Sequence, residues 1–171
     1  MQKIMDVKFK NRYRVDTIRL PSWDYGSDGW YFITICTKSR KPYFGKLSPQ
    51  GELEHTLLGD FVVQVWYTIP HFHPFAKLDQ FVLMPDHLHG ILLFVKDKCK
   101  PYKKNQFGPQ KQNLASVIRG FKSTVTSFAN RHNIDFNWQP RYHEMIIHNE
   151  ESLIHIREYI ESNPIKHAKS K

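Results

Sequence analysis

The stretch "FVLMPDHLHGILLF" (residues 81–94) decides the fold, because it holds two apolar segments separated by Pro85-Asp86. "KLDQFVLM" (77–84) and "HLHGILLFV" (87–95) have the composition of strands, and a Pro-Asp pair favours a turn between them. We therefore predict two antiparallel strands. Beyond Gly90 the second strand is apolar at every position, so we expect it to be buried on both faces and central in its sheet.

Two histidines, His87 and His89, open this central strand. Side chains alternate along a strand, so both imidazoles are predicted to lie on one face, about 7 Å apart. One interpretation is a pair of hydrogen-bonded structural histidines, because unpaired polar groups are costly to bury. The other is part of a metal site, which needs a third protein ligand or substrate oxygens. No C-x-x-C, H-E-x-x-H or acidic cluster lies nearby to decide between them.

The remaining segments complete an alternating pattern of strands and helices. "WYFITICT" (30–37) and "YHEMII" (142–147) predict strands. "TLLGDFVVQVWYTI" (56–69) predicts a helix that stops before Pro70, and "NLASVIRGFKSTVTSFANR" (113–131) a helix capped by Asn113. A last helix, capped by Asn149, is expected to end at about Pro164. The order β, α, β, β, α, β, α predicts an α+β domain on an antiparallel sheet.

The net charge of +9 suits a polyanionic partner, and nucleic acid is the first candidate. Residues 1–28 are interpreted as a basic arm. The segment 96–111 carries six lysines, Lys103 and Lys104 among them, and is predicted to be a flexible loop that binds phosphates. Arg119 and Lys122 on the helix 113–131, and Arg141 before a strand, are further candidates for DNA contacts. The alternative for Arg119 and Lys122 is an ordinary solvated helix face, and for Arg141 it is a contact with an acidic neighbour.

Other features favour one cytoplasmic domain spanning residues 1–171. No apolar run approaches the ~20 residues that cross a bilayer, so no membrane partner is expected. The basic first residues contain no apolar signal core. The two cysteines, Cys36 and Cys99, lie far apart in the sequence and form no metal-binding pair.

The last helix offers partners for the histidines. Tyr159 and Asn163 are four residues apart and share a helical face. Taken alone, each has an ordinary explanation, a tyrosine at the core edge and a polar residue at a helix end. Together with His87 and His89 they suggest phosphodiester chemistry, in which a metal polarises the phosphate and tyrosine attacks it. A phenol has a pKa near 10, so it needs the metal or a nearby base.

At this point the chain resembles the REP-associated tyrosine transposases, relatives of the single-tyrosine, His-hydrophobe-His transposases of small insertion sequences. The resemblance covers roughly residues 13–167 and rests on these stretches: "IRLPSWDYGSDGWYFITICTKSRKPYFGKL", "FVLMPDHLHGILLF", "VIRGFKSTVT", "WQPRYHEMIIHNEESL" and "YIESNP". Two positions depart from the family pattern. Asp86 stands where relatives often carry Asn, interpreted as a tolerated turn change. "MIIHN", with Met145 and His148, stands where they tend to have "HIIRN" or similar.

The resemblance implies an RRM-like or ferredoxin-like antiparallel sheet with packed helices and a central His-x-His strand. It implies Mg²⁺ or Mn²⁺ held by His87, His89 and Asn163, with Tyr159 as the nucleophile that leaves a 5′-phosphotyrosine. The expected function is a metal-dependent endonuclease and strand transferase on single-stranded, hairpin-associated DNA, acting as a monomer or homodimer. Two alternatives stay open: a non-catalytic RRM-like nucleic-acid-binding domain, and an RNA-processing metallonuclease that uses water.

Overall fold

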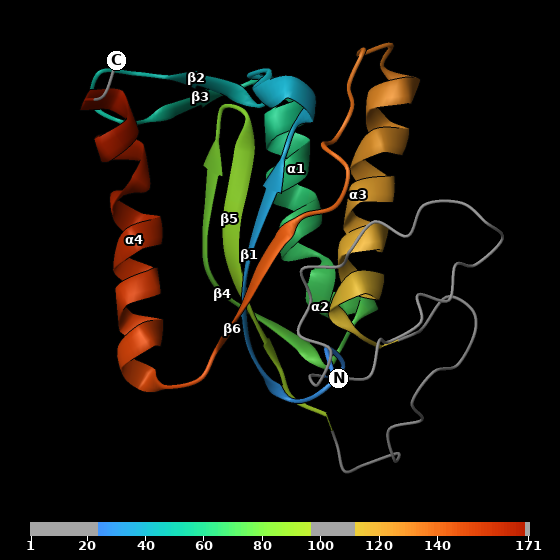
Figure 1. The fold of residues 1–171 in the computed structure, drawn as a ribbon. Helices are drawn as coiled ribbons and strands as arrows, with labels where there is room; N and C mark the ends of the chain where they lie inside the picture. Colours follow the sequence, from blue (N-terminus) through green and yellow to red (C-terminus); the bar gives the residue numbers. More distant parts are fainter. Residues whose placement is uncertain (1–23, 97–111, 170–171) are drawn as a thin grey trace, which may run out of the picture.

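The computed structural model describes residues 24–96 and 112–169 (Figure 1). The main sheet contains β1 (Gly29–Cys36), β4 (Ala76–Met84), β5 (His87–Phe94) and β6 (His143–Ile147), and a small hairpin contains β2 (Gly45–Leu47) and β3 (Leu53–His55). The α-helices are α1 (Leu57–Tyr67), α2 (Ile69–Phe72), α3 (Leu114–Arg131) and α4 (Glu150–Lys169). A short 3-10 turn, Lys38–Arg40, follows β1.

The four strands of the main sheet are ordered β4-β5-β1-β6, and every neighbouring pair is antiparallel. Without the β2–β3 hairpin and α2, the chain order is β-α-β-β-α-β-α, which begins with the ferredoxin-like pattern. The predicted α+β fold with an antiparallel sheet is therefore confirmed. The strand β5 lies between β4 and β1, so the His-x-His strand is central, as predicted.

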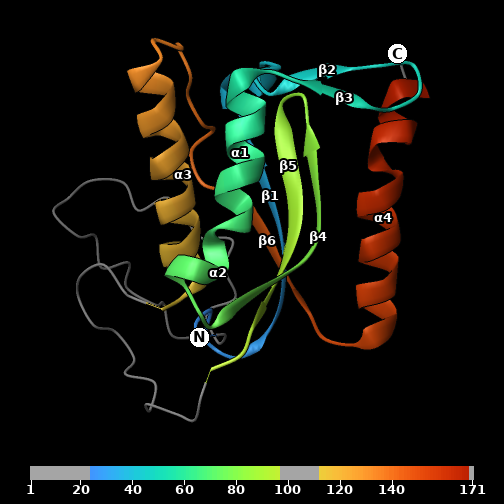
Figure 2. The same cartoon turned by 180° about the vertical axis from the view of Figure 1, so that it is seen from behind.

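Helices cover the two faces of the sheet unequally. Figures 1 and 2 show α1 and α3 on one side of the sheet and α4 alone on the other. The larger core lies under α1 and α3 and includes the fully buried Trp66 and Leu88. The smaller core lies under α4 and consists of six buried residues: Phe32, Ile91, Ile147, Leu153, Ile156 and Ile160. The α4 face of the sheet is therefore covered by one helix, whereas the opposite face is covered by two.

The helix starts follow the predicted capping signals. The Asn113 side chain accepts a hydrogen bond from the Ser116 backbone N–H at 2.9 Å, and the Ser116 hydroxyl accepts one from the Asn113 backbone N–H. Asn149 caps α4 in the same way, accepting from the Ser152 N–H at 2.8 Å. Each interaction satisfies a backbone donor that a helix start otherwise leaves unpaired.

The predicted end of the last helix at about Pro164 is wrong. The helix α4 continues to Lys169 and contains Pro164, although proline removes one helical hydrogen bond. The reason is a tertiary contact. The turn between β2 and β3 packs so closely on this helix that a Cβ added to Gly51 would lie 3.1–3.2 Å from backbone atoms of Pro164 and Ile165. Contact with the hairpin thus supports the last turns (Figure 1).

Parts of the predicted basic surface lie outside the described residues. These are residues 1–23 of the arm and residues 97–111 of the loop, with Lys103 and Lys104. At the start of the loop, the Lys96 ammonium donates hydrogen bonds to the carbonyls of Gly26 and Gln112. It thereby joins the end of the arm to the residue before the cap of α3. Among the described residues, no helix has the length and hydrophobicity to cross a membrane.

Candidate active site

The two histidines of β5 point toward the α4 side of the sheet, with ring centroids 4.7 Å apart. Both residues are buried, each with 5% of its surface exposed. In the register of the sheet, His89 lies opposite Thr34 of β1, and Thr34 lies opposite His143 of β6. Three polar side chains thus form one row across the face, as the alternation of strand residues requires.

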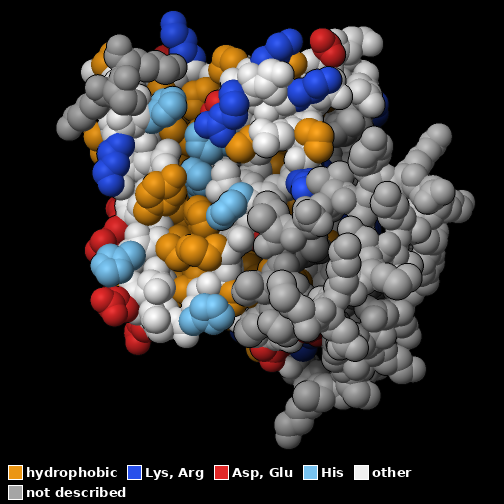
Figure 3. Space-filling view, viewed as in Figure 1, with side chains coloured by type: hydrophobic (Ala, Val, Ile, Leu, Met, Phe, Trp, Pro, Cys, Tyr) orange, Lys and Arg blue, Asp and Glu red, His pale blue; other side chains and the backbone are white. Residues whose placement is uncertain are grey.

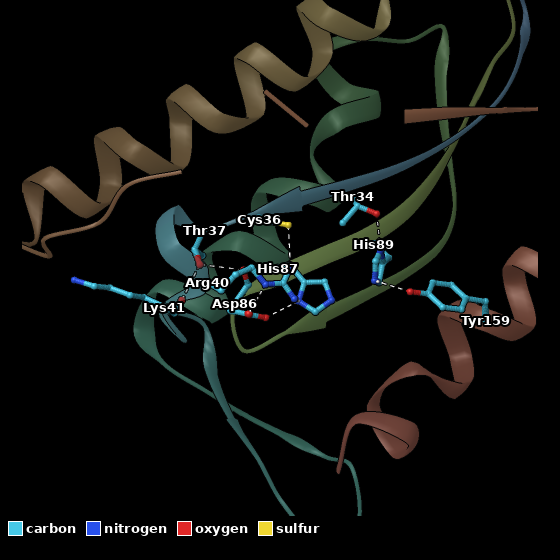
Figure 4. A network of polar contacts seen from close by, with 9 residues as sticks. All are labelled: Thr34, Cys36, Thr37, Arg40, Lys41, Asp86, His87, His89 and Tyr159. Atoms are coloured by element: carbon cyan, nitrogen blue, oxygen red, sulfur yellow. Dashed lines mark hydrogen bonds and ion pairs between the residues drawn. The ribbon is translucent and has the colours of Figure 1, made fainter. Parts of the chain in front are cut away.

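His89 is held by contacts on three sides, and Figure 4 shows those with Thr34 and Tyr159. The Thr34 hydroxyl and His89 Nδ1 share a hydrogen bond of 2.8 Å, and the imidazole stacks on the Phe32 ring with centroids 5.5 Å apart. On the remaining side, His89 Nε2 is 3.4 Å from the Tyr159 hydroxyl. Burial, followed by the nearby charges of His87 and Arg40, lowers the pKa of His89 to about 3. The ring is therefore neutral at physiological pH and can accept a hydrogen bond or bind a metal ion.

His87 is oriented by the residue before it. Its Nδ1 is 2.5 Å from the Asp86 carboxylate, and Arg40 Nε binds the other carboxylate oxygen at 2.7 Å. Arg40 Nη2 is also 3.2 Å from His87 Nδ1, but a protonated Nδ1 cannot accept it, so we assign the hydrogen bond to Asp86. Burial raises the pKa of Asp86, but its contacts with His87 and Arg40 outweigh burial and lower it overall. The carboxylate stays ionised and orients the His87 ring through Nδ1.

The turn that supplies Asp86 is fixed by the segment after β1. The backbone N–H of the fully buried Thr37 donates to the Asp86 carbonyl at 2.9 Å. Ser39 and Arg40 then adopt left-handed backbone conformations, with φ of 56° and 54°. A left-handed backbone conformation is uncommon for residues other than glycine, and residues that adopt it often lie at functional sites. The interpretation of Asp86 as a turn residue was therefore incomplete, because it also connects Arg40 to His87.

Tyr159 comes from α4, the helix on this face. Ile156 and Ile160 point into the core below the helix, while Tyr159 remains 44% exposed. The helix is anchored to β4 by Arg157, whose Nε and Nη2 bind the two carboxylate oxygens of Asp79 at 2.8 and 2.5 Å. Asn163 lies one turn after Tyr159 and is half-buried. Among the described residues it makes no hydrogen bond to either histidine, so the structure joins Tyr159 to His89 but not Asn163.

The two histidines offer suitable nitrogen ligands for a divalent ion, but they do not complete its coordination shell. Both histidines have Nδ1 engaged, by Asp86 and Thr34, which leaves both Nε2 atoms as ligands. In the described part of the chain, however, no group of three His, Cys, Asp or Glu side chains could hold a metal ion. Two imidazoles alone suit only an ion that completes its shell with further protein ligands, water or substrate oxygens.

The face around these residues is partly open. Figure 3 shows histidine and hydrophobic side chains gathered on it beside α4. Exposed side chains of this face include His143 and Met145 of β6 together with Tyr159. The Tyr159 side chain is therefore partly in contact with solvent on this face.

The basic residues that the sequence suggested as DNA contacts lie away from the histidines. Arg119, Lys122 and Arg141 line a common pocket between α3 and the segment before β6, on the other side of the sheet from the histidines. The Lys122 ammonium donates hydrogen bonds to the carbonyls of Gln139 and Arg141 at 2.8 and 3.0 Å. Sequence reasoning proposed all three residues separately, and their meeting in one pocket follows only from the fold. It missed Thr34, which the register of β1 against β5 brings to His89, and Arg40, which the 3-10 turn after β1 brings to Asp86.

Comparisons with known proteins identify a relative and a fold. No family model matches the chain. An uncharacterised protein of Haemophilus influenzae is 43% identical over 159 residues, which covers 87% of each chain. The structure of a REP-associated tyrosine transposase bound to a REP hairpin matches with a TM-score of 0.61 and 19% identity, covering 88% of this chain and 74% of the other.

A second solved structure, a provisionally assigned transposase from Deinococcus radiodurans, matches with a TM-score of 0.40 and 17% identity over 85% of this chain. That likeness is too weak to carry an argument. The stronger one shows a shared fold with the REP-associated tyrosine transposase. With 43% identity over 87% of each chain, this chain belongs to the same family as the Haemophilus influenzae protein.

Proposed function

We propose that this protein is a metal-dependent single-stranded DNA endonuclease and strand transferase of the transposase type, with Tyr159 as its nucleophile. The observation that carries the proposal is the 3.4 Å contact between the Tyr159 hydroxyl and Nε2 of His89. It brings an exposed tyrosine side chain to the neutral imidazole of His89, beside the oriented imidazole of His87. The shared fold with a transposase that is bound to a DNA hairpin supports the same reaction class.

The reaction exchanges one phosphate ester for another. The Tyr159 oxygen forms a bond to phosphorus, and the bond from phosphorus to the 3′-oxygen breaks. The phenolic proton balances the 3′-oxygen that leaves, so the products are a 5′-phosphotyrosine and a free 3′-hydroxyl. Attack by a second 3′-hydroxyl on the phosphotyrosine reverses these steps and joins a new strand. Because each step conserves one phosphodiester-type bond, no nucleotide hydrolysis is needed.

The residues around Tyr159 have separate tasks in this proposal. His87 and His89, with Asn163 one turn after the tyrosine, would hold Mg²⁺ or Mn²⁺, which supplies polarisation of the phosphate and stabilises the phenolate. Asp86 and Thr34 orient the two imidazoles through their Nδ1 atoms. Phe32 packs against both His89 and Tyr159, which holds the two rings next to each other.

The test is to trap the covalent intermediate. Wild-type protein is incubated with 5′- and 3′-labelled single-stranded oligonucleotides of mixed sequence, with and without hairpins, in Mg²⁺ or Mn²⁺. We expect a denaturation-resistant adduct that retains only the label on the 3′ side of the cut. Tyr159→Phe should abolish it, and Tyr67→Phe, which changes another exposed tyrosine on α1, should leave it intact.

The same assay separates the alternatives. If Tyr159→Phe cleaves DNA or RNA at the wild-type rate while His87→Ala does not, water is the nucleophile and the transposase proposal fails. If the wild-type protein binds DNA but cuts neither nucleic acid in either metal, the protein is a binding domain.

A further inference from the structure

A pocket of about 460 Å³ lies between α3 and the residues that lead into β6. Its cationic side chains are Arg119, Lys122 and Arg141, and its hydroxyl groups come from Ser123, Thr126, Ser127 and Tyr142. No acidic side chain is among the described residues that line it. A concave site with three cations and several hydroxyl groups has the chemistry of a phosphate site.

The cations are arranged by the fold and are not simply scattered on the surface. Lys122 lies beside the Trp138 ring, 5.7 Å from its centroid, and binds the carbonyls before β6. Burial lowers the pKa of the Lys122 ammonium, and a bound anion would offset that cost. Arg141 adopts a left-handed conformation with φ of 67°, which is unusual for arginine. Strain of this kind at a charged residue beside a pocket favours a ligand-binding role.

The pocket and the histidine face meet at one sheet edge. Arg141 and Tyr142 line the pocket, while the next residue, His143, faces the α4 side in the same row as Thr34 and His89. Two strand spacings, about 10 Å, separate His143 from His89. Since β6 is the edge strand, a flexible polyanion that crosses this edge can contact both places.

We propose that this pocket binds a backbone phosphate of single-stranded DNA, on the side of the sheet opposite the histidine pair. The choice of DNA rests on the proposed function, whereas the phosphate chemistry rests on the pocket. Half or more of protein–DNA hydrogen bonds go to phosphate and sugar and fix the strand's position without reading sequence. The pocket would therefore hold the strand in place beside the reaction site.

The experiment measures the salt dependence of oligothymidine binding to the full chain by fluorescence anisotropy in EDTA. The double variant Arg119→Gln/Arg141→Asn removes two pocket cations, and asparagine tolerates a positive φ. The control Lys77→Gln/Arg131→Gln removes two exposed cations outside the pocket and so has the same net charge. Each phosphate contact to a single strand adds about 0.7 to the log–log slope. We expect the pocket variant to lose about 1.4 and the control to keep its slope.

The single variant Arg119→Gln should lose about 0.7 of the slope, which protects the test if the double variant unfolds. Equal slopes for wild type, Arg119→Gln and the control would overturn the proposal. A second arm adds dTMP and follows thermal unfolding. If dTMP stabilises the wild type but not the pocket variant, and the oligonucleotide slopes are equal, the pocket serves a free nucleotide and the DNA proposal fails.

This measurement is independent of the cleavage chemistry, because EDTA removes divalent ions and Tyr159→Phe protein should give the same slopes. If the pocket variant loses slope but the wild-type protein forms no covalent adduct, the pocket binds phosphate and the proposed cleavage reaction is wrong. If the adduct forms but the pocket variant keeps its slope, the cleavage reaction is supported and the pocket proposal is wrong.

Discussion

The strand β5 needs a glycine at position 90, directly after the His-x-His pair, because the Trp66 ring packs against its backbone. A Cβ at Gly90 would overlap the ring of Trp66, which is fully buried and stacks on Phe81 with centroids 4.8 Å apart. A packed ring of this size has no space into which it can move. Gly90 therefore fixes how α1 approaches the strand that carries the histidines.

We predict that Gly90→Ala destabilises the fold by about 1–3 kcal/mol, the usual cost of an overpacked core. Gly120→Ala is the matched control, because it lies within α3, is exposed, and its added Cβ would have no neighbour nearer than 3.8 Å. Replacing a mid-helix glycine should stabilise by about 0.5–1 kcal/mol. Thermal unfolding measures both. Equal melting temperatures for Gly90→Ala and wild type would contradict this account of Trp66.

Asp86 provides a second prediction at the scale of single residues. Asp86→Ala removes the acceptor for His87 Nδ1 and the partner of Arg40, while Asp86→Asn keeps an acceptor and loses the charge. We expect the alanine variant to bind Mn²⁺ about 10–100-fold more weakly, as changes behind a metal-ligating histidine typically do. The asparagine variant should fall between it and wild type. Calorimetric titration with Mn²⁺ checks this order, and an asparagine variant weaker than alanine would contradict it.

Among the elements, α4 decides whether the tyrosine reaches the histidines. Its two-bond contact between Arg157 and Asp79 lies where the β4–β5 register shifts between Leu78 and Phe81. The Asp79 carboxylate also accepts from the Gln80 N–H at 2.7 Å, and Arg157 lies over the Trp30 ring. An irregularity in the strand thus presents a carboxylate to the helix, in the way bulges often redirect side chains near functional sites.

The hydrogen bonds from Arg157 are the main cause of a lowered pKa at Asp79. A carboxyl whose folded pKa is lowered contributes stability above its unfolded pKa of about 3.9, and the contribution disappears as pH falls through the folded pKa. Asp79→Asn should therefore cost on the order of 1 kcal/mol at pH 7, and the difference in melting temperature from wild type should vanish in strong acid. Arg157→Lys, which keeps the charge without the paired geometry, should be intermediate. A difference unchanged between pH 7 and pH 2 would refute the contact's role.

Elements also show what the sequence can and cannot predict. Strand composition and alternation predicted the central strand and the shared face of His87 and His89, because both properties depend on local residues. The path of α4 through Pro164 was not predictable, because a distant hairpin turn at Gly51 supports it. The same holds for Thr34, which reaches His89 through the pairing of β1 with β5, and for Arg40, which reaches Asp86 from the turn after β1.

At the scale of the whole molecule, the site forms where one helix meets a sheet face that it covers incompletely. The larger core, under α1 and α3, packs on one face of β5, and α4, which contains Tyr159, lies on the other side of the sheet (Figure 2). Sites built on such elements are more precise than sites on loops. Both contributions come from one chain, since the 3.4 Å contact joins Tyr159 to His89 of the same molecule.

This arrangement predicts that one chain suffices for the reaction. Tyr159→Phe and His87→Ala are each expected to be inactive, and mixing them should restore no adduct. Were the tyrosine helix exchanged between two chains, half of the dimers in an equal mixture would be mixed, and each would contain one intact site. Activity would then return to about one quarter of the wild-type level. Adduct yield on a labelled oligonucleotide measures the outcome, with co-refolded mixtures included so that slow exchange of subunits cannot hide complementation. Recovery near one quarter would place the tyrosine in trans and make the contact seen here a resting arrangement.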